Sequence, residues 1–268
     1  MKKLRVLFTA VIVAALGTAC GAGGGKSDAD AKKLTVAASQ IPHSEILEHV
    51  KPQLKKEGID LKIEVRPDYV TPNTLVEEGK ADANFFQHVP FMEATNKEKK
   101  YHIVKVANVH IEPMAAYSKK IKKVDELKEG ATIALPNDTS NLTRSLLLLE
   151  DQKLIKLDNR DGNKTERNIK ENPKKIKFKL VEAALLPRIL DQIDLAVINT
   201  NYAIQAKLNP VKDNLFIEGK DSPYANVLAT KQGKEKDESI QKLVKALNSP
   251  DTKKFIEDKY KGAVVPAF

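Results

Sequence analysis

Predominantly apolar runs of strand length alternate with amphipathic helical stretches along most of this chain, and this alternation restricts the fold most strongly. Residues 34–38 and 195–198 are short apolar runs, which are typical of strands buried inside a sheet. After the first run, Ile46, Val50 and Leu54 recur at the spacing of one helix face. Strands that alternate with helices predict an α/β protein with largely parallel sheets.

The alternation occurs twice, and extended stretches near residues 115–118 and 224–229 separate the two series. This arrangement favours two lobes with a cleft between them, although the periodicity alone also permits one large sheet. The charged stretch 156–175 has no period and is expected to be an exposed, structureless excursion. Further strands are expected at 61–65, 83–86, 103–106, 131–135, 177–181 and 226–230, and helices at 72–78, 89–96, 142–150, 184–191, 202–207, 237–247 and 251–260.

The charge of the chain is positive, and its distribution argues against nucleic-acid binding. The 268 residues include 45 Lys and Arg against 36 Asp and Glu, which gives a formal net charge of +9. Basic and acidic residues are interleaved, as where Glu93 and Glu98 flank Lys97. Because no basic stripe or known reader motif is present, we interpret the charges as solvated surface and expect no nucleic-acid partner.

The first residues have the pattern of an export signal. Positive residues precede an apolar run at 6–16, which is too short to span a bilayer and suits a signal peptide. The run leads through small residues to Cys20, the only cysteine, so no intrachain disulfide can form. The alternative is a conventional secretory signal followed by an incidental free thiol.

The residues around Cys20 resemble the lipobox of bacterial lipoproteins, although Gly17 stands where that motif usually has leucine. The resemblance implies cleavage after residue 19 and lipid, including palmitate, on Cys20. Residues 1–19 are then a signal peptide, and the Gly-rich segment 20–33 is a lipidated flexible tether. The expected location is the extracytoplasmic face of the cell membrane.

The chain contains no recognised catalytic motif. It has no G-x-S-x-G elbow, P-loop, G-x-G-x-x-G fingerprint or H-E-x-x-H pair. The five histidines are dispersed, and the closest pair, His43 and His49, does not have the spacing of one helix face. We therefore expect no enzyme activity, no cofactor and no metal site.

Polar and aromatic residues instead gather where predicted strands end and helices begin. Tyr69 lies in a loop, the segment 85–91 carries three aromatic rings and a histidine, and Arg144 lies in the first turns of a helix. Asn199 directly follows a buried strand. Each residue alone could be core, cap or surface, but ligands of α/β sheets bind at the carboxyl ends of strands. Together they predict a pocket with an apolar part and a carboxylate-binding part.

Several of these segments resemble one known family in the same order along the chain. The resemblance is to the methionine-binding lipoproteins that supply methionine ABC importers, and it runs from about residue 34 to the C-terminus. The segments are NFFQH (84–88), YSKK (117–120), IALPND (133–138), LLLLE (146–150), AVINT (196–200) and SPYAN (222–226).

The resemblance implies a two-lobed periplasmic-binding-protein fold of type 2, with the ligand cleft between the lobes. Lobe 1 then comprises 34–116 and 227–268, and lobe 2 comprises 117–226. The implied function is a monomeric receptor that captures methionine and delivers it to the permease of an ABC importer. The alternatives are the same role for another small amino acid or a short peptide, and a surface adhesin lipoprotein.

The resemblance also implies roles for individual residues. Arg144 matches the residue that binds the α-carboxylate, and Asn199 and Asn226 match the asparagines that hold the amino-acid end. Phe91 stands where a tyrosine is expected, so this position lacks a hydroxyl. The aromatic cage corresponds to Tyr69, Phe86, His88 and Phe91.

Overall fold

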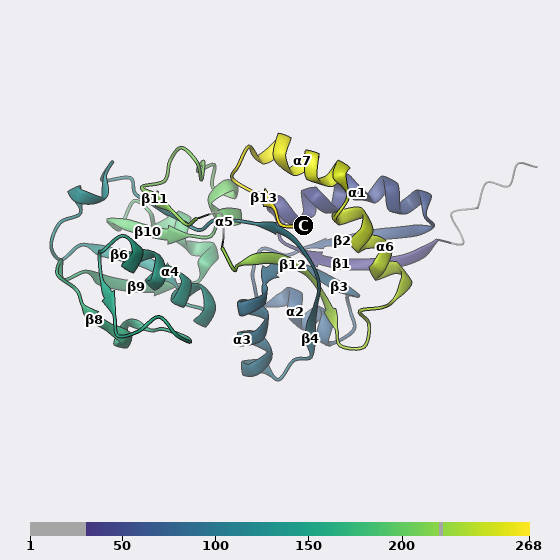
Figure 1. Cartoon of the computed structure of the whole chain (residues 1–268), viewed down its shortest axis with the longest axis horizontal. Coiled ribbons are helices and arrows are strands. Elements are labelled where there is room, and N and C mark those ends of the chain that lie inside the picture. Colours follow the sequence, from purple (N-terminus) through teal and green to yellow (C-terminus); the bar gives the residue numbers. More distant parts are fainter. Residues whose placement is uncertain (1–30, 220–221) are drawn as a thin grey trace, which may run out of the picture. The chain divides into compact units, whose positions relative to one another are not determined.

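The computed structural model describes residues 31–219 and 222–268, and these residues form two main β-sheets (Figure 1). Cys20, the predicted signal peptide and most of the predicted tether lie outside the described residues. Within the described part of the chain, no helix is both long and apolar enough to cross a membrane.

The first sheet has six strands in the order β13-β4-β12-β3-β1-β2. One face of this sheet packs against α1, α6 and α7, and the opposite face is covered by α2 and α3 (Figure 1). The strands are β1 Lys32–Ala38, β2 Ile59–Val65, β3 Ala83–His88, β4 Ile103–Ile111, β12 Ala225–Lys231 and β13 Val265–Pro266. The helices are α1 Glu45–Lys56, α2 Thr71–Glu77, α3 Val89–Lys99, α6 Glu238–Leu247 and α7 Pro250–Tyr260, and a π-helical turn, η2, spans Gln40–Ser44.

The second sheet has five strands in the order β11-β5-β10-β6-β9. Along β6, Ile133 and Leu135 belong to the apolar cluster that includes helix α4, whereas Ala134 belongs to the cluster on the other face. This alternation is the two-residue period of a strand with both faces covered. The elements are β5 Ala115–Tyr117, β6 Thr132–Pro136, β9 Lys177–Val181, β10 Leu195–Ile198, β11 Phe216–Ile217, α4 Thr139–Asp151, α5 Thr200–Gln205, and the 3-10 helices η3 Val124–Glu126 and η5 Ala183–Ile189.

The chain passes between the sheets twice, from β4 to β5 and from β11 back to β12. Each passage carries a glutamate, Glu112 in the first and Glu218 in the second. The strands next to these passages pair antiparallel with their neighbours, whereas β1 pairs parallel with β2 and β3. The expectation of largely parallel sheets is therefore wrong for the strand pairing, because β12 and β13 run against the other strands of the first sheet and β5 runs against those of the second.

Two local expectations are also corrected. The stretch 156–175 is not structureless, because β7 (Lys156–Leu157) and β8 (Ile169–Glu171) form a small antiparallel pair beside the 3-10 helix η4 (Glu166–Asn168). The helix expected at 184–191 is the 3-10 helix η5 and ends two residues earlier, at Ile189. Pro187 lies inside it and has no N–H to donate to an α-helical hydrogen bond. Strands of two or three residues are too short to show a period in the sequence.

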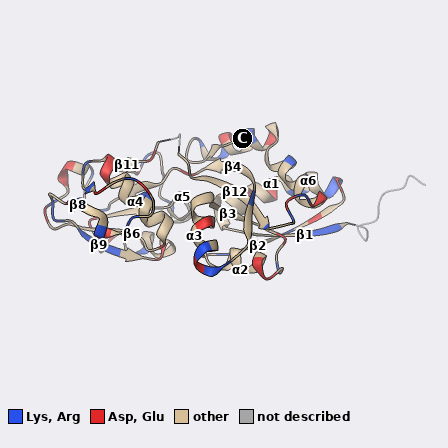
Figure 2. Cartoon of the chain, turned by 60° about the horizontal axis from the view of Figure 1, so that its bottom comes forward, with Lys and Arg blue, Asp and Glu red and all other residues tan. Residues whose placement is uncertain are grey.

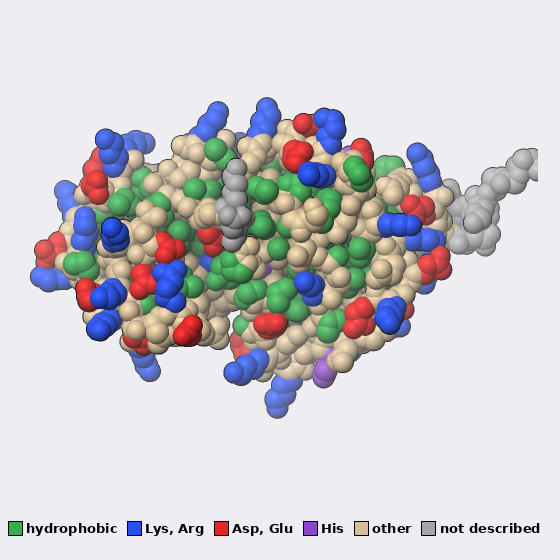
Figure 3. Space-filling model, viewed as in Figure 1, with side chains coloured by type: hydrophobic (Ala, Val, Ile, Leu, Met, Phe, Trp, Pro, Cys, Tyr) green, Lys and Arg blue, Asp and Glu red, His purple; other side chains and the backbone are tan. Residues whose placement is uncertain are grey.

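Basic and acidic residues are interspersed along the ribbon (Figure 2), and their side chains are intermixed on the face shown in Figure 3. Several form exposed ion pairs, such as Lys254 with Asp258 at 2.6 Å. Such pairs contribute little to stability, so their main effect here is to hold charges of both signs close together.

Candidate functional site

A pocket lies among side chains from both sheets and from the first passage between them. The carboxyl ends of β3 and β10 and the first turns of α3, α4 and α5 supply most of its wall. The lining residues are Tyr69, Phe86, Gln87, His88, Phe91, Glu112, Asn141, Arg144, Asn199, Thr200, Asn201 and Asn226.

The structure brings all seven residues that were singled out from the sequence to this one pocket. Cross-strand pairing explains part of the convergence, because Asn226 on β12 pairs with His88 on one side and with His110 on the other. Arg144 reaches the pocket from α4, and Asn199 reaches it from the end of β10.

Three aromatic rings form the apolar side of the pocket. The ring centroids of Tyr69, Phe86 and Phe91 are 5.7–5.9 Å apart in each pair. The hydroxyl of Tyr69 donates to Oδ1 of Asn201 at 2.6 Å, which ties this wall to helix α5 of the other sheet. Such a ring cluster offers polarizable, water-free surface to an unbranched apolar side chain.

Arg144 is buried, and much of its hydrogen-bonding capacity is already used. Its Nε donates to Glu218 at 3.0 Å, and its Nη2 donates both to the same carboxylate and to the backbone carbonyl of Glu112 at 2.9 Å. The guanidinium also lies 4.3 Å from the ring centroid of Tyr224. The fork formed by Nε and Nη2 is thus occupied by Glu218, and Nη1 is the nitrogen that remains for a ligand carboxylate.

A chain of side-chain hydrogen bonds sets the orientation of Asn199. The carboxylate of Asp138 accepts from Nδ2 of Asn141 at 3.0 Å, so Oδ1 of Asn141 must serve as an acceptor. Asn199 donates to this oxygen through its Nδ2 at 3.0 Å. Oδ1 of Asn199 is left buried without a partner among the described residues. The pocket therefore contains a free acceptor at Asn199.

His88 is neutral, and its two ring nitrogens are both engaged. Nδ1 accepts from the backbone N–H of Phe91 at 3.2 Å and caps helix α3, so Nε2 carries the proton and donates to Asn141 at 3.2 Å. Burial, with the nearby charge of Arg144, lowers the pKa of His88 to about 3. His88 therefore contributes its ring to the pocket wall and fixes its neighbours, but offers no free polar atom.

Asn226 has the opposite orientation from Asn199. Its Oδ1 lies 3.0 Å from Nε2 of His43, and the same nitrogen lies 3.3 Å from Oε1 of Glu112. Because the carboxylate can only accept, Nε2 of His43 carries the proton and donates. Nδ2 of Asn226 has no hydrogen-bond partner among the described residues, so it is a free donor in the pocket wall.

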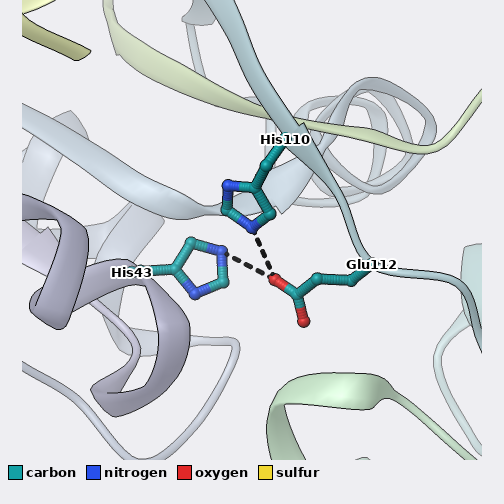
Figure 4. Close-up of side chains that lie close together, drawn as sticks. All are labelled: His43, His110 and Glu112. Carbon is teal, nitrogen blue, oxygen red and sulfur yellow. Dashed lines mark hydrogen bonds and ion pairs between the residues drawn. The ribbon is translucent and has the colours of Figure 1, made fainter. Parts of the chain in front are cut away.

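His43, His110 and Glu112 form a buried cluster (Figure 4), which lies behind Asn226 and contacts it through His43. Their ligand atoms lie within 4.8 Å of one another. His43 and His110 looked dispersed in the sequence, yet their ring centroids are 4.9 Å apart. Burial lowers the pKa of His43 to about 4 and that of His110 to about 3, and raises the pKa of Glu112.

Sequence reasoning missed several residues of the site. Asn141 stood in a cluster of helix-capping residues and Asn201 two positions after Asn199, so both carried a weak signal. Glu112 and Glu218 carried none, because their roles depend on how the two passages meet α4.

Comparison with known proteins gives a consistent result. The profile of the NlpA lipoprotein family matches residues 34–268. The methionine-binding lipoprotein MetQ of Bacillus subtilis is 40% identical over 272 residues, which cover 99% of both chains. The D-methionine-binding lipoprotein MetQ of Salmonella typhimurium is 40% identical over 96% of both chains.

Solved structures agree with the sequence comparison. A nutrient-binding protein from Burkholderia cenocepacia, solved with bound methionine, superimposes with a TM-score of 0.85 at 42% identity and covers 88% of this chain and 100% of its own. Lipoprotein Tp32 from Treponema pallidum also gives a TM-score of 0.85, at 41% identity over 88% of this chain and 99% of its own.

Proposed function

Because the chain belongs to the NlpA lipoprotein family, we propose that it is a solute-binding lipoprotein that captures methionine and delivers it to an ABC importer. The family match supports the resemblance and the two-lobed fold expected from the sequence. The proposed identity of the ligand rests on one observation, which is that unpaired polar atoms lie beside the aromatic rings of one pocket.

The free atoms of the pocket suit a zwitterion. Nη1 of Arg144 and Nδ2 of Asn226 are donors for the α-carboxylate, and Oδ1 of Asn199 is an acceptor for the ammonium group. Tyr69, Phe86 and Phe91 surround the position of the side chain, where contacts of sulfur with aromatic rings contribute about 0.3–1.5 kcal/mol each. These groups hold a ligand without attacking it, so the protein binds and releases methionine unchanged.

The proposed lobes correspond to the two sheets. Lobe 1 comprises 34–116 and 227–268, and lobe 2 comprises 117–226. The order of the strands supports a division close to these bounds, since β4 and β12 belong to the first sheet and β5 and β11 to the second. Residues 115–116 of β5 and 225–226 of β12 lie just across the proposed boundaries from the rest of their sheets. We expect a monomer, because each chain contains the whole pocket.

Methionine is expected to raise the melting temperature of the purified protein. A ligand that binds only the folded state adds RT ln(1 + [L]/Kd), or about 2.7 kcal/mol at one hundred times the Kd. Thermal unfolding with methionine, with other small amino acids and with short peptides checks the proposal. If another amino acid or a peptide gave a larger shift in melting temperature than methionine, that compound would be identified as the ligand. If none of them gave a shift, the adhesin alternative would be favoured.

Cys20→Ser is expected to release the protein from the membrane. The substitution removes the thiol to which lipid is attached at the lipobox, and no described helix could replace that anchor. Fractionation of cells that express either form measures the effect, and methionine binding by the released variant serves as the folding control. Equal membrane association of both forms would contradict the lipid anchor at Cys20.

A further inference from the structure

Glu112 lies in the first passage between the sheets, and it is both buried and part of the pocket wall. Its residue is 5% exposed, and its Oε1 lies 2.8 Å from Nε2 of His110 and 3.3 Å from Nε2 of His43. The second carboxylate oxygen points away from both rings (Figure 4).

Both histidines face Glu112 as hydrogen-bond donors. Nε2 of His43 lies between two acceptors, the carboxylate of Glu112 and Oδ1 of Asn226. Nε2 of His110 faces the same carboxylate oxygen. With the protons on Nε2, both rings are neutral and donate to one oxygen, which leaves the second oxygen of Glu112 to another partner.

The same three side chains do not make a convincing metal centre. A metal would bind the Nε2 atoms, so each ring would carry its proton on Nδ1. Metal-bound histidines usually donate that second N–H to an acceptor. Nδ1 of His43 and Nδ1 of His110 are both buried without a partner among the described residues. Protonation of these atoms would bury two unsatisfied N–H groups, so the hydrogen-bonded arrangement is the better explanation.

The ammonium group of a bound amino acid also favours an acceptor of this kind, because an unpaired charge is costly in a buried pocket. Arg144 and Glu218 neutralise each other, so this pair does not supply the partner. Oδ1 of Asn199 is a neutral acceptor, and a buried ammonium group is held more strongly by a carboxylate. Glu112 is close to Asn199, because both line the pocket and the hydroxyl of Thr200, next to Asn199, donates to the backbone carbonyl of Pro113, next to Glu112.

We propose that Glu112 is the charged acceptor for the ligand ammonium group, and that His43 and His110 are positioning residues that aim its second oxygen into the pocket. This inference rests on the proposed function, since it assumes an α-amino acid as the ligand. It assigns the ammonium group to Glu112 and Asn199, and leaves Asn226 and Arg144 to the carboxylate.

The test compares Glu112→Gln with the unaltered chain, using methionine and deamino-methionine, which has hydrogen in place of the ammonium group. Gln can still accept from both histidines, so the cluster should be retained. Titration calorimetry is expected to show methionine affinity lowered at least about 30-fold, and deamino-methionine affinity changed less than about threefold. Glu77→Gln is the control, because Glu77 also pairs with a histidine, His102 at 3.2 Å, but does not line the pocket.

Equal losses for both ligands, or unchanged methionine affinity, would overturn the assignment. Stoichiometric Zn²⁺ binding that disappears in Glu112→Gln would also overturn it, because the carboxylate would then be a metal ligand. If Glu112→Gln does not fold, Glu112→Asp is the second variant. Its shorter side chain keeps the negative charge but holds the carboxylate farther from the ligand, so the affinity for methionine should fall and that for deamino-methionine should not. Failure of the unaltered chain to bind methionine is a separate result, which contradicts the proposed ligand.

Discussion

Arg144→Ala is expected to weaken methionine binding by about 2–5 kcal/mol, because a desolvated carboxylate would lose its only cationic partner in the pocket wall. Arg144 is 3% exposed, so water cannot readily replace it. Methionine and norleucine should lose affinity alike, since both present the same carboxylate. Titration calorimetry with both ligands measures the effect.

Phe86→Leu is the matched contrast, because it changes the apolar wall and leaves the polar groups in place. It keeps apolar volume but removes ring contact with sulfur, so methionine should lose about 1 kcal/mol and norleucine less. Arg144→Lys, which keeps the charge without the planar fork, should not restore binding. Because Arg144→Ala also leaves Glu218 without its partner, thermal unfolding of the ligand-free variants must accompany the titrations. Wild-type affinity in Arg144→Ala would remove the central residue of the proposed site.

The sequence allowed the position of the pocket to be predicted because its chemistry follows regular elements. Asn199 comes directly after β10, and Arg144 lies in the first turns of α4. Both positions could be read from apolar periodicity, since the carboxyl ends of strands are where α/β proteins bind ligands. The family match confirms the resemblance that assigned roles to them, but those roles themselves remain predictions.

The cluster behind Asn226 could not be predicted, because it depends on strand register. His43 lies before α1, and His110 lies on β4 beside Asn226 of β12, the strand that inserts between β4 and β3. No spacing in the sequence encodes that insertion. Glu112 and Glu218 were missed for a similar reason, since each lies in a passage between the sheets and accepts a hydrogen bond from Arg144 of α4.

The orientation of each asparagine amide could not be predicted from the sequence either. Asn199 and Asn226 looked equivalent as holders of the amino-acid end. The hydrogen-bond networks distinguish them. Nδ2 of Asn199 donates to Asn141, whereas Oδ1 of Asn226 accepts from His43. Asn199 is left as an acceptor and Asn226 as a donor.

Asn226→Asp is therefore expected to weaken methionine binding by about 3 kcal/mol or more, because a second carboxylate would face the ligand carboxylate. His43 can still donate to one oxygen of the new aspartate, so the loss should come from repulsion of the ligand rather than from a broken cluster. Methioninol, which has a hydroxymethyl group in place of the carboxylate, should not be penalised.

Asn199→Ala should give a different pattern with the same two ligands. Loss of its acceptor oxygen should weaken methionine and methioninol alike, by about 1.5–3 kcal/mol, since both carry the ammonium group. Calorimetric titration of the two variants with the two ligands yields four affinities that together define the direction of the bound ligand. If Asn226→Asp instead strengthened the binding of both ligands, the ammonium group would face position 226, and the ligand would lie in the pocket with its two charged ends exchanged.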